Sequence, residues 1–388
     1  MVKYQILFGY APLKIAKNCS ECRWVLSLAN YYMPMFKQGI MRFLGFPLAF
    51  LYALGFFFAR WWGKRRAWRA KGIKVIKLGN LAVGGTGKTP HTAYLAEWLA
   101  AYASPVAVVS RGYGRKTREM RLVQPQDSAA DVGDEPLWLK QQQPDTLVIV
   151  ARQRREALEW LQREHSRCRI ALLDDAMQHW AVDADAEILL TAYDAPFFDD
   201  YWLPAGRLRE GRTGAARAHA IIVSQCPPQL SAQQRQDFLA RVRRYNAHAP
   251  VFFSFYNYAQ AYALSDVGAL LPAAMLAQSR PLLLSAIARP AALLQFLQTQ
   301  CTEVAHLAYA DHHAFSAQDI AFICAETQRA NADFVLTTEK DATRLMPFAP
   351  TFAQAQIAVF VLPIRVCFHD DDAQRLAQFL QPLLETKS

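Results

Sequence analysis

The chain has 388 residues, of which 53% are hydrophobic and 20% are charged, and it contains seven cysteines. This composition excludes a disordered chain and a disulfide scaffold, and the length suits two or three domains of about 150 residues each. The formal net charge of +10 lies at one end, because residues 1–96 hold fifteen Lys and Arg against a single acid, Glu21. A nucleic-acid binder usually spreads its basic residues over a folded domain, so we expect no nucleic-acid partner.

An uncharged run, FLGFPLAFLYALGFFFA, occupies residues 43–59 within this basic end. As a helix it is about 25 Å long, and two tryptophans that follow extend it toward the roughly 30 Å of a bilayer core. Eight Lys and Arg without an acid then occur between residues 60 and 77, a pattern typical of the cytoplasmic side of a membrane. We therefore predict a membrane helix with a basic collar at 43–71, preceded by an extension of unassigned role at 1–42. A buried helix followed by a solvated basic linker is the alternative.

The rest of the chain has the pattern of an α/β protein. Short β-branched or apolar runs alternate with helical segments, which predicts a parallel sheet with helices on both faces. We expect strands at residues 73–78, 105–110, 146–151, 169–173, 187–191 and 218–223, and a helix at 88–102. The pattern restarts near residue 250, with runs at 251–256, 281–286, 334–338 and 357–363. We predict a nucleotide-binding domain at 72–250 and a smaller α/β domain at 251–388 that closes over the cleft.

A glycine-rich loop follows the first of these strands. It matches the phosphate-loop pattern, with alanine at the first glycine position, over Ala82, Val83, Gly84, Gly85, Thr86, Gly87, Lys88 and Thr89. Glycines let backbone N–H groups turn toward phosphate oxygens, the lysine reaches the β- and γ-phosphates, and the threonine hydroxyl coordinates Mg²⁺. A strand before the loop and a helix after it are the context that such a loop needs. The sequence therefore predicts binding of ATP with Mg²⁺.

Two adjacent carboxylates, Asp174 and Asp175, follow the strand expected at 169–173. A phosphate loop needs an acid at the tip of a neighbouring strand to hold Mg²⁺. Paired carboxylates at one strand tip are costly unless a cation neutralises them. We predict that both contribute to the metal site, with helix capping as the alternative.

Several classes of nucleotide enzyme use this loop. The core GGTGKT is similar to that of partitioning ATPases that dimerise on membranes, but Val83 stands where those carry a lysine. A GTPase usually reads guanine with Asn-Lys-x-Asp after a late strand, whereas residues 224–227 read SQCP. Both differences argue against these two classes. The membrane-associated partitioning ATPase stays as the second hypothesis.

Seven blocks of the chain resemble the tetraacyldisaccharide 4'-kinase family, the lipid A 4'-kinases of Gram-negative bacteria. They occur in the family's order over about residues 43–365: GNLAVGGTGKTP, SRGYGR, VGDEP, LLDDAMQHW, LPAGRLRE, ADHHAF and TTEKDATRL. The resemblance implies ATP- and Mg²⁺-dependent phosphorylation of the 4'-hydroxyl of a tetraacylated glucosamine disaccharide 1-phosphate, giving lipid IVA. It also implies a location at the cytoplasmic face of the inner membrane and a lipid substrate delivered from that surface. The role of TTEKDATRL is not assigned.

Residue roles follow from the chemistry of phosphoryl transfer, which needs positioned charge and a group to take the hydroxyl proton. Asp134, in a loop where a helix begins, is the candidate base, and the resemblance implies the same role. The resemblance also implies His312 as its partner from the second domain, with His313 as the alternative. Lys88 completes the predicted catalytic set. The residues predicted to bind substrate are Arg111, Tyr113, Glu135, Gln178, Arg207 and Arg209, and Arg115 is a further candidate of the same kind.

Overall fold

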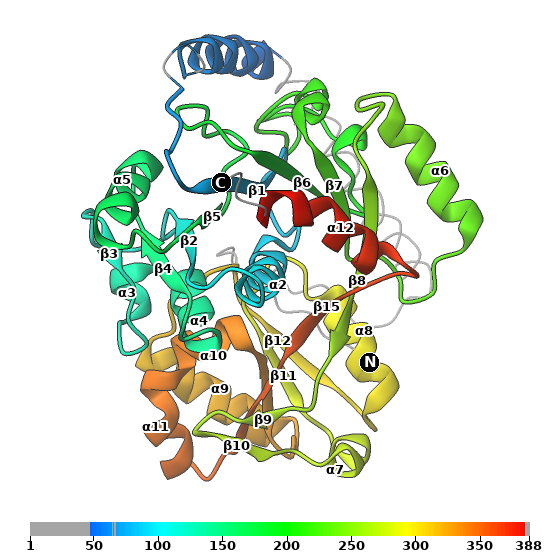
Figure 1. Ribbon diagram of the computed structural model, residues 1–388. Helices are drawn as coiled ribbons and strands as arrows, with labels where there is room; N and C mark the ends of the chain where they lie inside the picture. Colours follow the sequence, from blue (N-terminus) through cyan, green and yellow to red (C-terminus); the bar gives the residue numbers. More distant parts are fainter. Residues whose placement is uncertain (1–46, 64, 66, 385–388) are drawn as a thin grey trace.

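The computed structural model describes residues 47–384 except 64 and 66, and two β-sheets organise this part of the chain (Figure 1). The larger sheet has nine strands in the order β15-β8-β7-β6-β1-β5-β2-β4-β3. It is parallel except at its edges, where β3 and β15 run antiparallel to their neighbours. Its strands are β1 (Lys74–Asn80), β2 (Val106–Ser110), β3 (Arg121–Leu122), β4 (Leu147–Val150), β5 (Ile170–Leu173), β6 (Ala186–Ala192), β7 (Ala220–Ser224), β8 (Val251–Tyr258) and β15 (Ile364–Phe368).

Helices cover both faces of the larger sheet because its strands are apolar on both sides. In β1, Ile76 and Leu78 join one core cluster, whereas Val75 points to the opposite face and joins another. The first cluster contains buried leucines of α2 (Lys88–Ala100), α4 (Asp134–Gln142) and α12 (Asp372–Leu384). The opposite face is covered by α5 (Arg154–Glu164) and α6 (Ala232–Arg243). A one-turn helix, α3 (Ala129–Val132), leads into α4, and two short 3₁₀ helices occupy Phe197–Asp199 and Arg212–Arg217.

The smaller sheet has six strands in the order β10-β9-β14-β13-β11-β12. Its parallel strands are β11 (Leu282–Ser285), β12 (Ala305–Ala308), β13 (Val335–Thr338) and β14 (Val359–Leu362). The antiparallel strands β9 (Tyr262–Ala263) and β10 (Asp266–Leu270) form one edge. The helices of this part are α7 (Ala273–Gln278), α8 (Ala291–Gln300), α9 (Ala317–Arg329), α10 (Glu339–Leu345) and α11 (Ala349–Gln354), with a 3₁₀ turn at Met346–Phe348.

The two sheets divide the chain differently from the prediction of a second domain at 251–388. β8 pairs with β7, and β15 pairs with β8, so both strands belong to the larger sheet, as does the covering helix α12. The chain therefore enters the smaller sheet after β8 and returns from it through β15. This return is a long-range pairing that hydropathy along the chain does not reveal. Seven strands of the larger sheet form where the sequence predicted them, whereas the edge strands β3 and β15 were not predicted.

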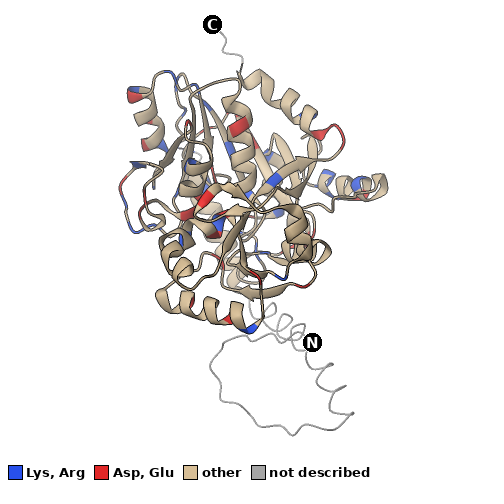
Figure 2. Cartoon of the chain, turned by 90° about the horizontal axis from the view of Figure 1, so that it is seen from below, with Lys and Arg blue, Asp and Glu red and all other residues tan. Residues whose placement is uncertain are grey.

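A helix over residues 47–63 precedes β1 and lies across the top of the molecule in Figure 1, remote from the smaller sheet. Its outward side exposes Leu48, Phe50, Leu51, Leu54, Phe57, Phe58 and Trp61. Among the helices that the structure describes, none is both long and apolar enough to cross a membrane. The extension predicted at 1–42 and the first residues of the apolar run lie outside the described residues. Elsewhere in the described chain, Lys and Arg residues are interspersed with Asp and Glu residues along the ribbon, as Figure 2 shows.

Candidate active site

The phosphate loop connects the buried strand β1 to helix α2, and its backbone orientation is fixed from outside. Three consecutive carbonyls of the loop accept hydrogen bonds from side chains: Gly85 O from Gln225 Nε2 (3.1 Å), Thr86 O from Ser224 Oγ (2.8 Å) and Gly87 O from His91 Nδ1 (2.7 Å). Each peptide N–H points opposite to the carbonyl of the same peptide unit. The amides of residues 86–88 are therefore directed away from these three side chains, which leaves them available to an anion at the start of α2.

Lys88 lies in a network of polar side chains at the end of β1. Its Nζ is 3.5 Å from Asn80 Oδ1 and 3.8 Å from Asp175 Oδ1. Arg209 binds both oxygens of Asp175, at 3.0 and 2.7 Å, and also contacts Asn80. Burial alone raises the pKa of Asp175, but Lys88 and Arg209 outweigh it and lower the pKa to about 2. Asp175 is therefore an ionised carboxylate that already has two cationic partners.

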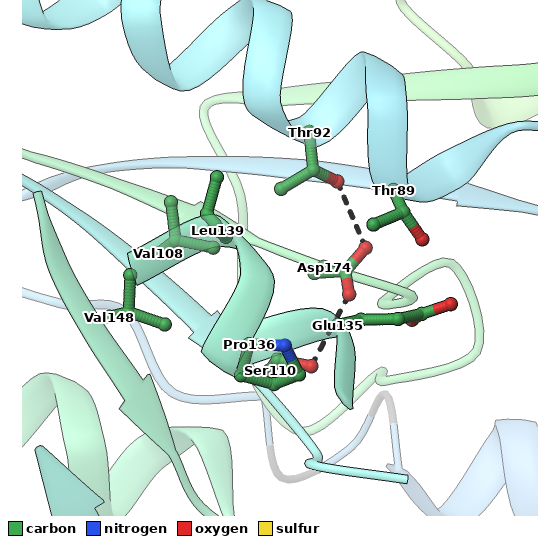
Figure 3. A pocket seen from close by; sticks show the side chains of 9 residues that line it. All are labelled: Thr89, Thr92, Val108, Ser110, Glu135, Pro136, Leu139, Val148 and Asp174. Atoms are coloured by element: carbon green, nitrogen blue, oxygen red, sulfur yellow. Dashed lines mark hydrogen bonds between the residues drawn. The ribbon is translucent and has the colours of Figure 1, made fainter. Parts of the chain in front are cut away.

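Asp174 is in a different environment, although it is adjacent in sequence. It is buried at the tip of β5 and accepts hydrogen bonds from Thr92 Oγ1 (3.0 Å) and Ser110 Oγ (3.3 Å). Burial and the nearby carboxylates of Glu135 and Asp175 raise the pKa of Asp174 to about 6. Asp174, Glu135 and the Thr89 hydroxyl line one small cavity (Figure 3). Carboxylate and hydroxyl oxygens without a full cationic partner suit a hard divalent cation such as Mg²⁺. Thr89 and Asp174 are the residues that could hold such a cation.

Asp134 and His312 are 178 residues apart in sequence and meet between the two sheets. His312 Nδ1 lies 2.9 Å from Asp134 Oδ2 and 3.2 Å from Asp134 Oδ1. Asp134 begins α4 directly after Gly133, and His312 lies in the loop after β12 with a positive φ of 60°. Burial alone raises the pKa of Asp134, but the His312 hydrogen bond and the charges of Lys340 and Arg344 outweigh it and lower the pKa below its ordinary value. Asp134 is thus an ionised carboxylate in a shielded position, as a general base requires.

His313, the alternative partner, faces elsewhere. Its Nε2 is 3.2 Å from Asp319 Oδ2, and its ring lies against Tyr309. The structure therefore brings His312, and not His313, to Asp134.

The residues predicted to bind substrate divide into two groups. Arg111 and Tyr113 are exposed, and the ring of Tyr113 lies 5.1 Å from that of His312. Glu135 lines the cavity described above, and its Oε1 lies 3.1 Å from Lys340 Nζ. The other side chains bond within the protein: Arg115 to Glu119 O (2.7 Å), Gln178 to Asn80 O (2.9 Å), Arg207 to Asp200 (2.8 Å) and Arg209 to Asp175. In this conformation these four side chains therefore hold other parts of the protein in place.

The helix at residues 47–63 docks beside this site through one side. Tyr52 OH donates to Arg209 O at 3.2 Å. Phe56 packs edge-on against Trp180 and Trp202, with ring centroids 4.9 and 5.5 Å apart. One turn further along, Arg60 lies 3.5 Å from the buried Glu210. The contacts recur every four residues, which is the spacing of one helical face.

Sequence reasoning missed several residues of the site. They are Asn80, His91, Ser224, Gln225, Lys340 and Arg344. Residues 224 and 225 lack the acid that reads guanine, and their side chains instead hold the phosphate loop. The block TTEKDATRL was singled out without a role, and it supplies Lys340 and Arg344.

A phosphate loop after the first strand of a parallel sheet, with a carboxylate at a neighbouring strand tip and a shielded carboxylate–histidine pair, defines a P-loop kinase. The family model for tetraacyldisaccharide-1-phosphate 4'-kinase matches residues 41–385. The chain therefore belongs to that family. The partitioning ATPase is not favoured.

Individual relatives agree with this assignment. The chain is 34% identical over 337 residues to the tetraacyldisaccharide 4'-kinase of Phocaeicola vulgatus, covering 85% of this chain and 91% of the relative. It is 39% identical over 274 residues to that of Flavobacterium psychrophilum, covering 70% and 78%. Among solved structures, LpxK from Aquifex aeolicus in complex with ATP has a TM-score of 0.65 at 22% identity, covering 88% of this chain and 98% of that one. This likeness establishes the fold.

Proposed function

We propose that this protein transfers the γ-phosphoryl group of ATP to the 4'-hydroxyl of a tetraacyldisaccharide 1-phosphate. The observation that carries the proposal is the Asp134–His312 pair, positioned one residue from Glu135, which lines the same cavity as Thr89 and Asp174. The residue that follows the proton acceptor and a residue of the phosphate loop thus line one small cavity. Family membership supports the substrate class.

In the proposed reaction the acceptor oxygen forms a bond to the γ-phosphorus, and the bond from that phosphorus to the ADP oxygen breaks. The hydroxyl proton goes to a carboxylate oxygen of Asp134, which is ionised before the step. Lys88 and the loop amides hold the phosphates and stabilise the charge that develops in transfer. Mg²⁺, when bound, supplies further charge neutralisation at the phosphate oxygens.

We further infer that Arg111, Tyr113 and Glu135 bind the acceptor, because Arg111 and Tyr113 are exposed, Tyr113 lies against the ring of His312, and Glu135 adjoins Asp134. For the remaining predicted set, Gln178, Arg207 and Arg209, we propose that substrate contact requires a conformation different from the present one. Asp175 is proposed to orient Lys88 rather than to coordinate Mg²⁺ directly, since its oxygens are already bound by Arg209.

We also infer that the protein works at the cytoplasmic face of the inner membrane. The outward side of the helix at residues 47–63 carries seven exposed large apolar side chains, named above, and the basic collar follows it. Apolar insertion together with attraction of Lys and Arg to anionic lipid is a two-part anchor. The same helix contacts Arg209, so the anchor lies directly beside the proposed site.

The experiment that tests the proposed function is a kinase assay with γ-radiolabelled ATP and the tetraacyldisaccharide 1-phosphate in detergent micelles. We expect label in the lipid and little ATP hydrolysis without it. Lys88→Ala should abolish transfer, since removing one contact to developing charge typically costs about 10²-fold or more. Strong lipid-independent hydrolysis that rises with protein concentration would instead identify a dimerising ATPase.

A further inference from the structure

The segment TTEKDATRL places Lys340 against the ring nitrogen of His312 that does not face Asp134. We propose that Lys340 is a positioning residue of the Asp134–His312 pair: it fixes which nitrogen of His312 carries the proton and thereby leaves Asp134 as the proton acceptor. This inference rests on the proposed function and adds a residue to its machinery.

The ammonium of Lys340 has three hydrogens and three acceptors around it. Its Nζ lies 3.1 Å from His312 Nε2, 3.1 Å from Glu135 Oε1 and 3.2 Å from Asp311 Oδ1. An ammonium only donates, so the Nε2 atom must offer its lone pair. Two carboxylates beside a largely buried side chain keep Lys340 charged, and its pKa is raised despite the burial that alone lowers it.

Whether Nε2 carries a hydrogen determines whether Nδ1, the other ring nitrogen, carries one. A neutral imidazole with a free Nε2 lone pair carries its hydrogen on Nδ1, and Nδ1 lies 2.9 Å from Asp134 Oδ2. His312 therefore donates to Asp134 and cannot take a proton through Nδ1. A proton could enter His312 only at Nε2, where Lys340 stands. Asp134 is consequently the group that accepts the hydroxyl proton, and His312 orients it.

Helix α10 is built to hold Lys340 in this place. Thr338 caps its first turn by accepting from Asp341 N at 3.2 Å. Asp341 accepts in turn from Ala286 N at 3.0 Å, which ties α10 to the loop after β11. Lys340 and Arg344 are one turn apart and face α4, which lies beside α10 in Figure 1. Arg344 Nη1 is 3.6 Å from Asp134 Oδ2, so α10 directs two cations at the pair.

The charged and titratable groups that face His312 come from four elements. They are Asp134 and Glu135 on α4, Asp311 beside it in its own loop, Lys340 on α10 and the exposed Tyr113. Lys340 is the cation in contact with the ring among the described residues. Burial alone lowers the pKa of His312, but Asp134 outweighs it and raises the pKa, while Lys340 opposes this rise. Lys340 also lowers the pKa of Asp134, so its removal should favour protonation of both His312 and Asp134.

The test compares three substitutions by the pH dependence of kcat/KM and kcat in the micellar assay. Lys340→Met removes the charge and the hydrogen bond, Lys340→Gln keeps an N–H donor without charge, and Lys340→Arg keeps both. We expect Lys340→Met to lower kcat by about 10- to 10²-fold, less than removal of the base itself. The acid limb should move upward by about one to three pH units, as for loss of a neighbouring charge. Lys340→Gln should retain most of kcat at its optimum but show the same shift, and Lys340→Arg should restore the profile.

Two controls keep the outcome decisive. Thermal unfolding and ATP affinity report whether each variant folds, and Arg329→Gln on the exposed surface of α9 should leave the profile unchanged. In a His312→Gln background, Lys340→Met should have little further effect if it acts through His312. An unshifted profile, a full additional loss in that background, or a change confined to KM would overturn the inference. Those results would make Lys340 a substrate ligand while leaving the proposed kinase activity intact.

Discussion

Gly133, the residue before Asp134, has a conformation that only glycine adopts readily. Its φ is 93° and its ψ is 149°, and a Cβ there would lie 3.1 Å from Gly112 Cα and 3.1 Å from Tyr113 O. Both neighbours are backbone atoms, which cannot rotate away. Gly133→Ala therefore costs about 1–3 kcal/mol of backbone strain, with the close contacts in addition. The strain is relieved most directly by shifting the start of α4, which carries Asp134.

We expect Gly133→Ala to reduce kcat by about 10- to 10²-fold, because a misplacement of about 1 Å at a reacting group can cost about 10²-fold. The matched control is Gly114→Ala in the adjoining loop. Gly114 also has a positive φ, 77°, but a Cβ there meets nothing within 4 Å. Both variants should unfold a few degrees lower, since a domain of this size loses about 2–4 °C per kcal/mol.

The micellar kinase assay and thermal unfolding decide this prediction together. Gly133→Ala should lose kcat with little change in ATP affinity, whereas Gly114→Ala should keep kcat. Wild-type kcat in Gly133→Ala, or an equal loss in Gly114→Ala, would refute the reasoning that the glycine positions Asp134.

Asp134→Asn should lower kcat by about 10²- to 10⁴-fold at unchanged ATP affinity; combination with His312→Ala should be less than additive, and fully additive losses would separate the two roles. Burial lowers the pKa of His91 to about 4 against a partial offset from Gly87 O, so the neutral form stabilises the fold above about pH 6.5 and this contribution is lost as the pH falls toward 4. The stability lost between pH 7 and pH 4.5 through this histidine is about 2–3 kcal/mol. Urea unfolding should show this loss in the wild type and not in His91→Gln, and an identical pH dependence of stability in both would contradict the prediction. On the helix at residues 47–63, Phe57→Asp should weaken sedimentation with anionic vesicles and spare micellar kcat, if this helix anchors the protein as proposed. Phe56→Ala, which loses its packing on Trp180 and Trp202, should instead lower micellar activity. Equal effects of the two variants on vesicle binding and activity would show that the helix has no distinct lipid-facing side.

Features that depend on short stretches of chain could be predicted from the amino-acid sequence. The glycine pattern and the strand and helix around it fixed the phosphate loop at residues 82–89, because such a loop needs only consecutive residues. Apolar runs likewise located the seven parallel strands of the larger sheet, since burial on both faces is visible in each run, but not its edge strands β3 and β15. The blocks of family resemblance carried the reaction class.

The tertiary structure decided which distant groups meet. Two adjacent histidines are equivalent in the sequence, and only the fold turns His312 to Asp134 and His313 to Asp319. The adjacent acids at the tip of β5 also differ only in space: Asp175 binds Arg209, whereas Asp174 is buried between hydroxyls. Apart from the His313–Asp319 contact, these contacts join segments separated by tens to hundreds of residues. Their selection depends on how whole elements pack, as in the placement of α10 against α4, and no local pattern encodes it.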